Sequence, residues 1–256
     1  MIGGRANARG QGWTTCRPCS LRALLAYIAV ICIILGAVVS TLRWASRQTL
    51  QSGCDGRLGA IALALHQYHQ DYGCFPPAYI ADARGKPVHS WRLLVLASAD
   101  YPAKSVYDSY NFDETWDSPN NNKLAASMAE FYTCPNQHMH SGSTLTNYVV
   151  IVGPGTVFPG ARPTALTDAR DSPNHTILIA EVADSGINWM EPRDLELSRM
   201  SFLPNDPSRP SISSRDPGGP GIVLADGTRM RLGKQSSSGL IKTMAVRTKN
   251  GVTNKP

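Results

Sequence analysis

Residues 23–42 read ALLAYIAVICIILGAVVSTL, and this stretch decides the fold. Apart from the phenol of Tyr27 and the thiol of Cys32, none of its side chains can ionise. A helix of this length measures about 30 Å, the thickness of the hydrocarbon core of a bilayer. The stretch is longer than the apolar region of a signal peptide, and no A-x-A cleavage pattern follows it. We therefore expect an uncleaved transmembrane helix over residues 21–43.

A second helical pattern follows without a break. Residues 44–73 contain no proline, and Gly53 and Gly56 are the positions where a helix over these residues would be weakest. Apolar residues then recur at the alternating spacing of three and four that places them on one helix face: Leu58, Ile61, Leu65, Tyr68 and Tyr72. Gly73 can cap this helix, and the two prolines at 76 and 77 prevent its continuation. We expect an amphipathic half that packs through this single stripe.

The remainder of the chain has the sequence pattern of a β-rich domain. Short apolar runs at 147–152, 176–182, 221–225 and 228–232 are strand candidates. The last two flank Asp226-Gly227, a dipeptide preferred in type I′ hairpins. The run WRLLVLASA after residue 90 fits either a strand or a short helix. One long helix followed by antiparallel strands predicts an α+β fold, with an exported domain over 44–234 and a tail over 235–256 whose polar end is mobile.

Charge is concentrated near the N-terminus. Residues 1–57 carry seven arginines and one acid, whereas acidic and basic groups balance over residues 58–256. A nucleic-acid-binding protein needs positive charge on the folded surface that contacts the phosphates. Because the charges of residues 58–256 balance, we expect no nucleic-acid partner. Residues 1–20 lack the apolar periodicity needed to fold. We expect them in the cytoplasm and the large C-terminal part outside it, although arginines on both sides of the span make the charge rule itself a weak guide.

Three of the six cysteines are exported on this topology: Cys54, Cys74 and Cys134. Disulfides persist outside the cytoplasm, and one bridge leaves one thiol over. A bridge between Cys54 and Cys134 would close a loop of about 80 residues and contribute about 4–5 kcal/mol on the chain-entropy model. The CRPC pair at Cys16 and Cys19 has no second pair nearby, so a zinc site there is disfavoured.

His66 and His69, three residues apart, lie on one face of the amphipathic helix. They could share a metal, but no H-E-x-x-H pattern is present and Cys74 falls beyond the helix end. Partly exposed surface histidines are the favoured interpretation. A transition-metal cluster of His138, His140 and Cys134 is disfavoured because a bridged Cys134 is no ligand.

A membrane helix that continues into an amphipathic helix packed on a sheet resembles the type IV pilin and pseudopilin plan. The segment CDGRLGAIALALHQYHQDYGCFPPAYIADARGKPVHSWRLLVL from Cys54 resembles the DUF1559, or H-x9-DG, family of planctomycete pilin-like proteins. The blocks YTCPN, TNYVVIVGPGTVFPG, HTILIAEVADSGINWMEPRDL and SSRDPGGPGIVLADGTRMRL resemble later family blocks in the same order. The resemblance covers about Cys54 to Leu232 and implies a long N-terminal helix packed on an antiparallel sheet.

The chain departs from the family pattern in two places. The family motif has a histidine ten positions before Asp-Gly, and here Asp216 stands at that position ahead of Asp226 and Gly227. In the family's prepilin leader a glycine ends the basic head and a glutamate follows five residues later, whereas here Pro18 and Ala23 occupy these places. We therefore expect no processing by a prepilin peptidase, because Pro18 restricts the backbone at the cleavage position. The usual filament contact of that glutamate is also missing.

The motifs and candidate catalytic residues of the sequence favour a protein that is not an enzyme. Asp216 and Asp226 could act as paired carboxylates, but the glycines and prolines around them indicate turns. The chain has no G-x-S-x-G, no P-loop and no dinucleotide fingerprint, so we expect no cofactor.

One stretch of the sequence offers ligands suited to calcium. Some pseudopilins hold calcium in a C-terminal loop, and the stretch TDARDSPN offers oxygen ligands from Asp168, Asp171 and Asn174. Their spacing matches no loop signature, so turn and cap roles are favoured and the three residues remain calcium candidates only.

The loop INWMEPRDL contains Trp189, Met190 and Glu191. Loops with large aromatic residues often mark contact surfaces, so these residues form either a packed cover over the sheet or a partner contact.

We expect a single-pass protein of the cytoplasmic membrane, with a cytoplasmic N-terminus and an extracytoplasmic pilin-like domain. The expected role is that of a pseudopilin-like structural or accessory component of the cell envelope, or of a type II secretion or type IV pilus-like assembly. Its expected partners are the lipid bilayer through residues 21–43 and either further copies of itself or secretion-machinery subunits. The alternative is an envelope-anchored binding module that holds a ligand or partner without forming filaments.

Overall fold

The computed structural model describes residues 21–99, 102–128, 130–136, 143–166, 173–233 and 235–247. The chain divides into two units, Met1–Ser46 and Arg47–Pro256. Both expected helical patterns belong to one helix, α1 (Leu21–Tyr72), which continues through Gly53 and Gly56. In the first unit the described apolar side chains of this helix are exposed; Leu21, Tyr27 and Ile33 are each 71% exposed. In the second unit one face of the helix is buried.

The buried face of α1 belongs to the larger of two hydrophobic cores. Leu58, Ile61 and Leu65 of the predicted stripe are at most 3% exposed, whereas Tyr72 at its end is 56% exposed. Gly73, with a φ of 74°, donates its backbone N–H to the carbonyl of His69 and ends the helix. The predicted stripe is confirmed over its first three members and fades toward the helix end.

The main sheet has four antiparallel strands in the order β3-β5-β7-β8. They are β3 (Tyr148–Val149), β5 (Ile177–Glu181), β7 (Gly221–Leu224) and β8 (Arg229–Arg231). Each lies in one of the predicted apolar runs. Two further strands, β4 (Ile151–Val152) and β6 (Leu195–Glu196), pair in parallel beside it.

Alternation along the strands places side chains in two cores on opposite faces of the sheet. Tyr148, Leu178 and Val223 face the core that contains α1. Ile222 and Leu224 face a second core. That core is closed by α4 (Ser238–Ala245), which contributes Ile241, Met244 and Ala245. Part of the expected tail is therefore a packed helix.

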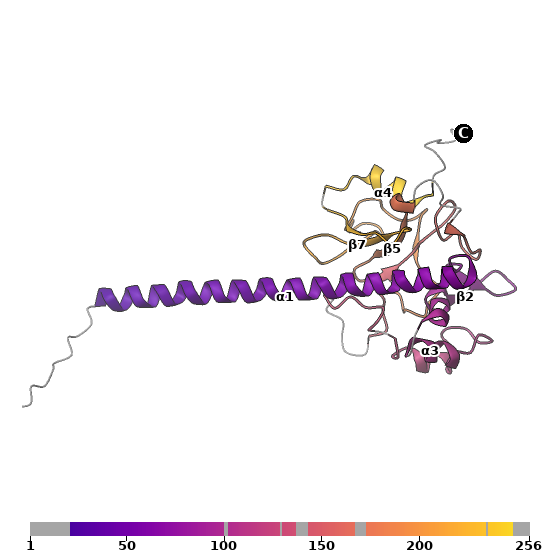
Figure 1. Cartoon of the computed structure of the whole chain (residues 1–256), viewed down its shortest axis with the longest axis horizontal. Coiled ribbons are helices and arrows are strands. Elements are labelled where there is room, and N and C mark those ends of the chain that lie inside the picture. The colour runs from indigo at the N-terminus through magenta and orange to yellow at the C-terminus, as the bar shows by residue number, and fades with distance from the viewer. Residues whose placement is uncertain are drawn as a thin grey trace, which may run out of the picture. The chain divides into compact units, whose positions relative to one another are not determined.

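The connecting segments hold short elements. The run after residue 90 forms α2 (Trp91–Leu94) and the 3-10 turn η1 (Val95–Ser98), not a strand. The hairpin of β1 (Tyr79–Ala81) and β2 (Pro87–Ser90) precedes them. The other elements are α3 (Ala103–Ser109), η2 (Asn121–Leu124) and η4 (Pro173–His175). In Figure 1, β5 and β7 lie on one side of the C-terminal half of α1, and α3 lies on the other.

A buried ion pair joins α2 to the loop before β6. The guanidinium of Arg92 lies 2.6 Å from the carboxylate of Asp194, and their side chains are 0% and 2% exposed. The amide of Val150 and the indole of Trp91 also donate to Asp194. Burial raises the pKa of Asp194, and these three donors oppose that rise. The pair fixes the loop against the sheet.

The turn between β7 and β8 corrects one expectation. A type I′ turn needs positive φ at both central residues, but only Gly227 of the Asp226-Gly227 pair has it, at 88°. The amide of Gly227 donates to the carbonyl of Leu224, and the amide of Leu224 donates to Thr228. The connection is thus a longer turn closed by a left-handed glycine. The architecture as a whole is α+β and pilin-like, with a long N-terminal helix packed on an antiparallel sheet.

Candidate functional site at the Cys54–Cys134 disulfide

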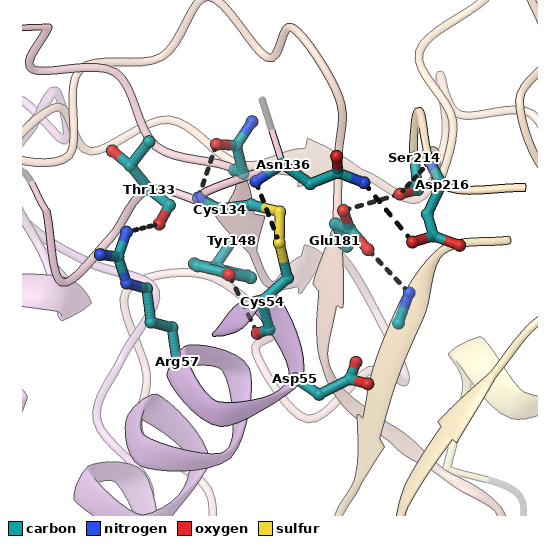
Figure 2. The surroundings of a disulfide bond; sticks show 12 residues. Cys54, Asp55, Arg57, Thr133, Cys134, Asn136, Tyr148, Glu181, Ser214 and Asp216 are labelled. Atoms are coloured by element: carbon teal, nitrogen blue, oxygen red, sulfur yellow. Dashed lines mark hydrogen bonds between the residues drawn. A yellow bond between two sulfur atoms is a disulfide. The ribbon is translucent and has the colours of Figure 1, made fainter. Parts of the chain in front are cut away.

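A disulfide joins Cys54 of α1 to Cys134 of the segment before β3, 80 positions later in the chain (Figure 2). Both cysteines are buried. Arg57, one turn further along α1, donates to the carbonyl of Thr133. On the other side the amide of Cys134 donates to the side-chain oxygen of Asn147 at 3.0 Å. The segment that carries Cys134 is therefore fixed between the helix and the start of β3.

Asp216, which the sequence resemblance aligns with the histidine of the family motif, lies beside this disulfide (Figure 2). Its carboxylate accepts hydrogen bonds from the backbone amide of Gly218 at 2.7 Å and from the side-chain amide of Asn136 at 3.4 Å. The backbone amide of the same Asn136 lies 3.5 Å from the sulfur of Cys54. Figure 2 shows Asn136 between the disulfide and Asp216. Asp216 thus serves as a polar anchor for the disulfide-bonded segment.

Arg231 of β8 connects Asp216 to the helix. Its guanidinium lies 2.7 Å from the carboxylate of Asp55 and 3.8 Å from that of Asp216. It also donates to the carbonyl of Gly219 at 2.7 Å. One cation therefore joins α1, the edge strand and the loop that carries the family motif. Because Asp55 is 39% exposed, solvent weakens its ion pair with Arg231.

Glu181 at the end of β5 is the buried acid of the site, at 2% exposure. Its carboxylate accepts from the hydroxyl of Ser214 at 2.8 Å and from the amide of Gly221 at 2.9 Å. Among the described residues no cation lies within 4.0 Å of it. Burial raises the pKa of Glu181, while the two hydrogen bonds and the more distant Arg231 oppose the rise. This carboxyl group is therefore held toward its neutral form.

Asp226 and Gly227 lie beside a different part of α1 from Asp216. The Asp226 carboxylate accepts from the amide and the hydroxyl of Thr228, so it stabilises its own turn. Gly227 faces His66, whereas Asp216 is tied through Arg231 to Asp55. His66 lies eleven positions beyond Asp55 in α1, which is about 16 Å along the axis. The structure therefore does not bring Asp216 and Asp226 together as paired carboxylates.

The two helix histidines are half-buried. The rings of both contact Phe75, at centroid distances of 5.6 Å for His66 and 4.9 Å for His69. The Nε2 atom of His69 accepts from the amide of Leu166 at 3.0 Å. Burial, followed by the neighbouring His69, lowers the pKa of His66, while Asp226 opposes this. Both histidine rings therefore pack against Phe75, which follows the end of α1.

Of the two interpretations of the loop at Trp189, the structure agrees with the packed cover over the sheet. Trp189 and Met190 are 0% and 1% exposed. The Trp189 indole donates to the carbonyl of Ala125 at 2.6 Å and its ring stacks on Tyr132. Glu191 pairs with Arg193 at the surface. A partner contact through Trp189 and Met190 is wrong, because the large aromatic ring fills the space between the sheet and the 125–132 segment.

The calcium candidates are only partly described. Asp168 and Asp171, like His138, His140, Cys16, Cys19 and Pro18, lie outside the described residues. Asn174 is described, and its side-chain oxygen lies 2.8 Å from the ring of His175. Within the described ranges no three His, Cys, Asp or Glu residues lie close enough to hold a metal ion.

Sequence reasoning missed the partners of Asp216. Glu181 did carry a signal, since it is the lone acid at the end of the apolar run ILIAE. Asn136, Ser214 and Arg231 carried none, because their role depends on the sheet register.

A surface groove adjoins this site. It has a volume of about 490 Å³ and lies between residues 51–58 of α1 and the edge strand β8. Asp55 and Arg231 belong both to the groove and to the ion-pair network described above. The site therefore combines a fixed disulfide, a buried acid and an accessible polar surface.

The described residues contain one helix that is long and apolar enough to cross a membrane, with a mean hydropathy of 2.6 in its most apolar window. A signal sequence or a single membrane anchor shares these properties.

Comparison with known proteins gives one family. Residues 43–191 match the model of a family described as a protein of unknown function (DUF1559). No curated protein matches the chain, and no solved structure matches it. The matched residues include Cys54, Cys134 and Glu181 and end before Asp216. Because the match extends over more than half of the 256 residues, the chain belongs to the DUF1559 family.

Proposed function

We propose that the protein is a membrane-anchored, pseudopilin-like structural or accessory component of the cell envelope, or of a type II secretion or type IV pilus-like assembly. The observation that carries this proposal is the division of α1 into two kinds of surface. The side chains described between Leu21 and Ser46 are exposed and mostly apolar. From Cys54 onward the same helix buries one face in the core of the second unit. Exposed apolar surface on this scale needs lipid or protein to cover it.

The proposed topology is N-terminus inside, with the second unit outside the cytoplasm. The Cys54–Cys134 disulfide supports this location, since disulfides persist outside the reducing cytoplasm. We further propose that the N-terminal segment is retained, because Pro18 and Ala23 replace the glycine and glutamate of a prepilin leader. We assign no catalytic residue and no cofactor, and the proposed role is not enzymatic.

A crosslinking experiment in membranes tests the assembly role. A photo-crosslinking residue at Leu63 reports on contacts of α1, since this side chain is 69% exposed on the second unit. The matched control is Leu203, which is 54% exposed and lies in a loop. Assembly through α1 predicts a ladder of self-adducts from position 63 and none from position 203. Absence of self-adducts from both positions would contradict an assembly of copies.

The second candidate function is an envelope-anchored binding module, and the groove beside β8 favours it. In the crosslinking experiment this function predicts one adduct with a different protein, or none, in place of a ladder. A direct ligand-binding measurement on the groove separates the two functions further.

A further inference from the structure

The groove between α1 and β8 is lined by both polar and apolar residues. Gln51, Ser52 and Asp55 line it from the helix, and Arg229 and Arg231 line it from the strand. Leu58 and Ile222 close its base. Its volume of about 490 Å³ falls in the range of small-molecule sites. The charges in this lining are two guanidinium groups and one carboxylate.

Arg229 is the cation of the groove without a carboxylate partner. Within the described part of the chain no carboxylate oxygen lies within 4.0 Å of it, and its Nη1 atom donates only to the backbone carbonyl of Asp55 at 3.5 Å. Its side chain lies across Gly59 of α1, where an added Cβ would stand 2.9 Å from Nη1 and 3.2 Å from Cδ. The glycine therefore lets the guanidinium lie close to the helix, with donors left over for a ligand.

Three neighbours of Arg229 in the lining, Arg231, Gln51 and Ser52, carry further hydrogen-bond donors, and the negative charge of Asp55 is paired with Arg231. The carboxylate of Asp55 is paired with Arg231 at 2.7 Å, so it is compensated. The buried Nε of Arg231 has no hydrogen-bond partner among the described residues. In the same described set, the side chains of Gln51 and Ser52 make no hydrogen bond to protein groups. The lining thus contains one guanidinium without a carboxylate partner, that of Arg229, while Arg231 is shared between Asp55 and Asp216.

We propose that this groove binds an oxyanion, a phosphate or carboxylate group of a small ligand, with Arg229 as its principal contact. A guanidinium presents two parallel N–H donors whose spacing matches the two oxygens of a phosphate or a carboxylate. Ser52 and Gln51 carry neutral donors elsewhere in the lining, on α1. This inference does not depend on the proposed function, because every residue that lines the groove belongs to one chain.

Titration of the full-length chain in detergent micelles tests the proposal. The probes are inorganic phosphate and succinate, and sodium chloride at equal ionic strength corrects for general salt effects. The expected result is a saturable heat or thermal shift with at least one probe and none with chloride. The Arg229→Gln variant is expected to weaken binding at least about tenfold, since it removes the charged donor pair. Arg215→Gln is the matched control, because Arg215 is an exposed arginine paired with Asp184.

A second variant separates binding from folding. Gly59→Ala displaces the guanidinium of Arg229, yet alanine favours a helix over glycine by up to about 1 kcal/mol. We expect weaker binding in a chain that melts no earlier than the wild type. Response to phosphate alone or to succinate alone identifies the anion, and either supports the site. The proposal is overturned if neither probe saturates, if chloride acts equally, or if Arg229→Gln binds as tightly as the wild type.

Discussion

Glu181 gives the candidate site a pH-dependent contribution to stability. Its carboxyl group has an ordinary pKa of 4.5, and burial raises this pKa in the folded chain. Between the ordinary and the raised value the folded state binds more protons than the unfolded state. The free energy of unfolding therefore falls as the pH rises through this window, which begins near pH 4.5.

Glu181→Gln is expected to remove this fall. Glutamine keeps an acceptor for the amide of Gly221 and carries no charge, so the variant should gain stability relative to the wild type as the pH rises. Denaturation of both chains between about pH 4 and about pH 8 measures the difference. Glu196→Gln, at a side chain 54% exposed, is the control and should change little. An equal loss at every pH in Glu181→Gln would contradict a raised pKa.

Gly219 is required by the backbone beside Arg231. Its φ is +88°, and an added Cβ would lie 2.0 Å from the carbonyl oxygen of Leu232. We expect Gly219→Ala to destabilise the chain by about 3 kcal/mol or more, the range of a strained and sterically blocked position. Gly239→Ala in α4, with nothing within 4 Å, is the matched control and should be neutral or slightly stabilising. Equal melting temperatures of the two variants would refute this account of Gly219.

At the residue scale, sequence reasoning found positions more readily than partners. Asp216 was singled out by its motif, but its link through Arg231 to Asp55 joins residues up to 176 positions apart. Such a contact follows from sheet register and helix packing, which no local pattern contains. Trp189 shows a related limit: a large aromatic residue in a loop suits a surface contact and a core equally well until the fold is known.

Among the elements, α1 owes its place to the buried side chains of its C-terminal half, which include Leu58, Ile61 and Leu65. Ile61 is 0% exposed and Leu63, two positions later, is 69% exposed. Ile61→Ala should destabilise the chain by about 2–5 kcal/mol through the cavity that it leaves. Leu63→Ala should stay within about 0.5 kcal/mol of the wild type. Chemical denaturation of both variants checks this, and comparable losses would mean that the buried face of the helix is assigned wrongly.

The disulfide links α1 to the segment before β3. On the chain-entropy model, a closed loop of about 80 residues stabilises by about 4–5 kcal/mol. The Cys54→Ala/Cys134→Ala chain should lose stability of this order, whereas Cys74→Ala, at a free and half-buried cysteine, should lose much less. Differential scanning calorimetry measures the change. Labelling of Cys54 and Cys134 by a thiol reagent without reductant would refute the bridge.

At this scale the sequence predicted the strands of the main sheet and missed the short C-terminal helix. The strands β5 and β7 lie within predicted runs, because a short continuous apolar stretch bounded by turns is typical of a buried strand. The eight residues of α4 were assigned to a tail, since so short a helix gains its stability from packing against the sheet. The turn at Asp226-Gly227 was placed correctly but given the wrong type, because the longer loop needs a positive φ at the glycine alone.

For the whole molecule, the central claim is that the exposed apolar half of α1 holds the chain in a membrane while the second unit lies outside the cytoplasm. The family match extends from residue 43 to 191 and so includes only the last of the residues, 21–43, that are expected to span the bilayer. The anchor is therefore proposed on physical grounds, from the length and the hydropathy of the helix.

The most direct test is the intact mass of the chain recovered from carbonate-washed membranes of cells that express it. An uncleaved anchor predicts that the protein stays in the membrane pellet with a mass that includes residues 1–43. A protein released by the wash, or one whose mass shows that cleavage has removed residues 21–43, would contradict the account.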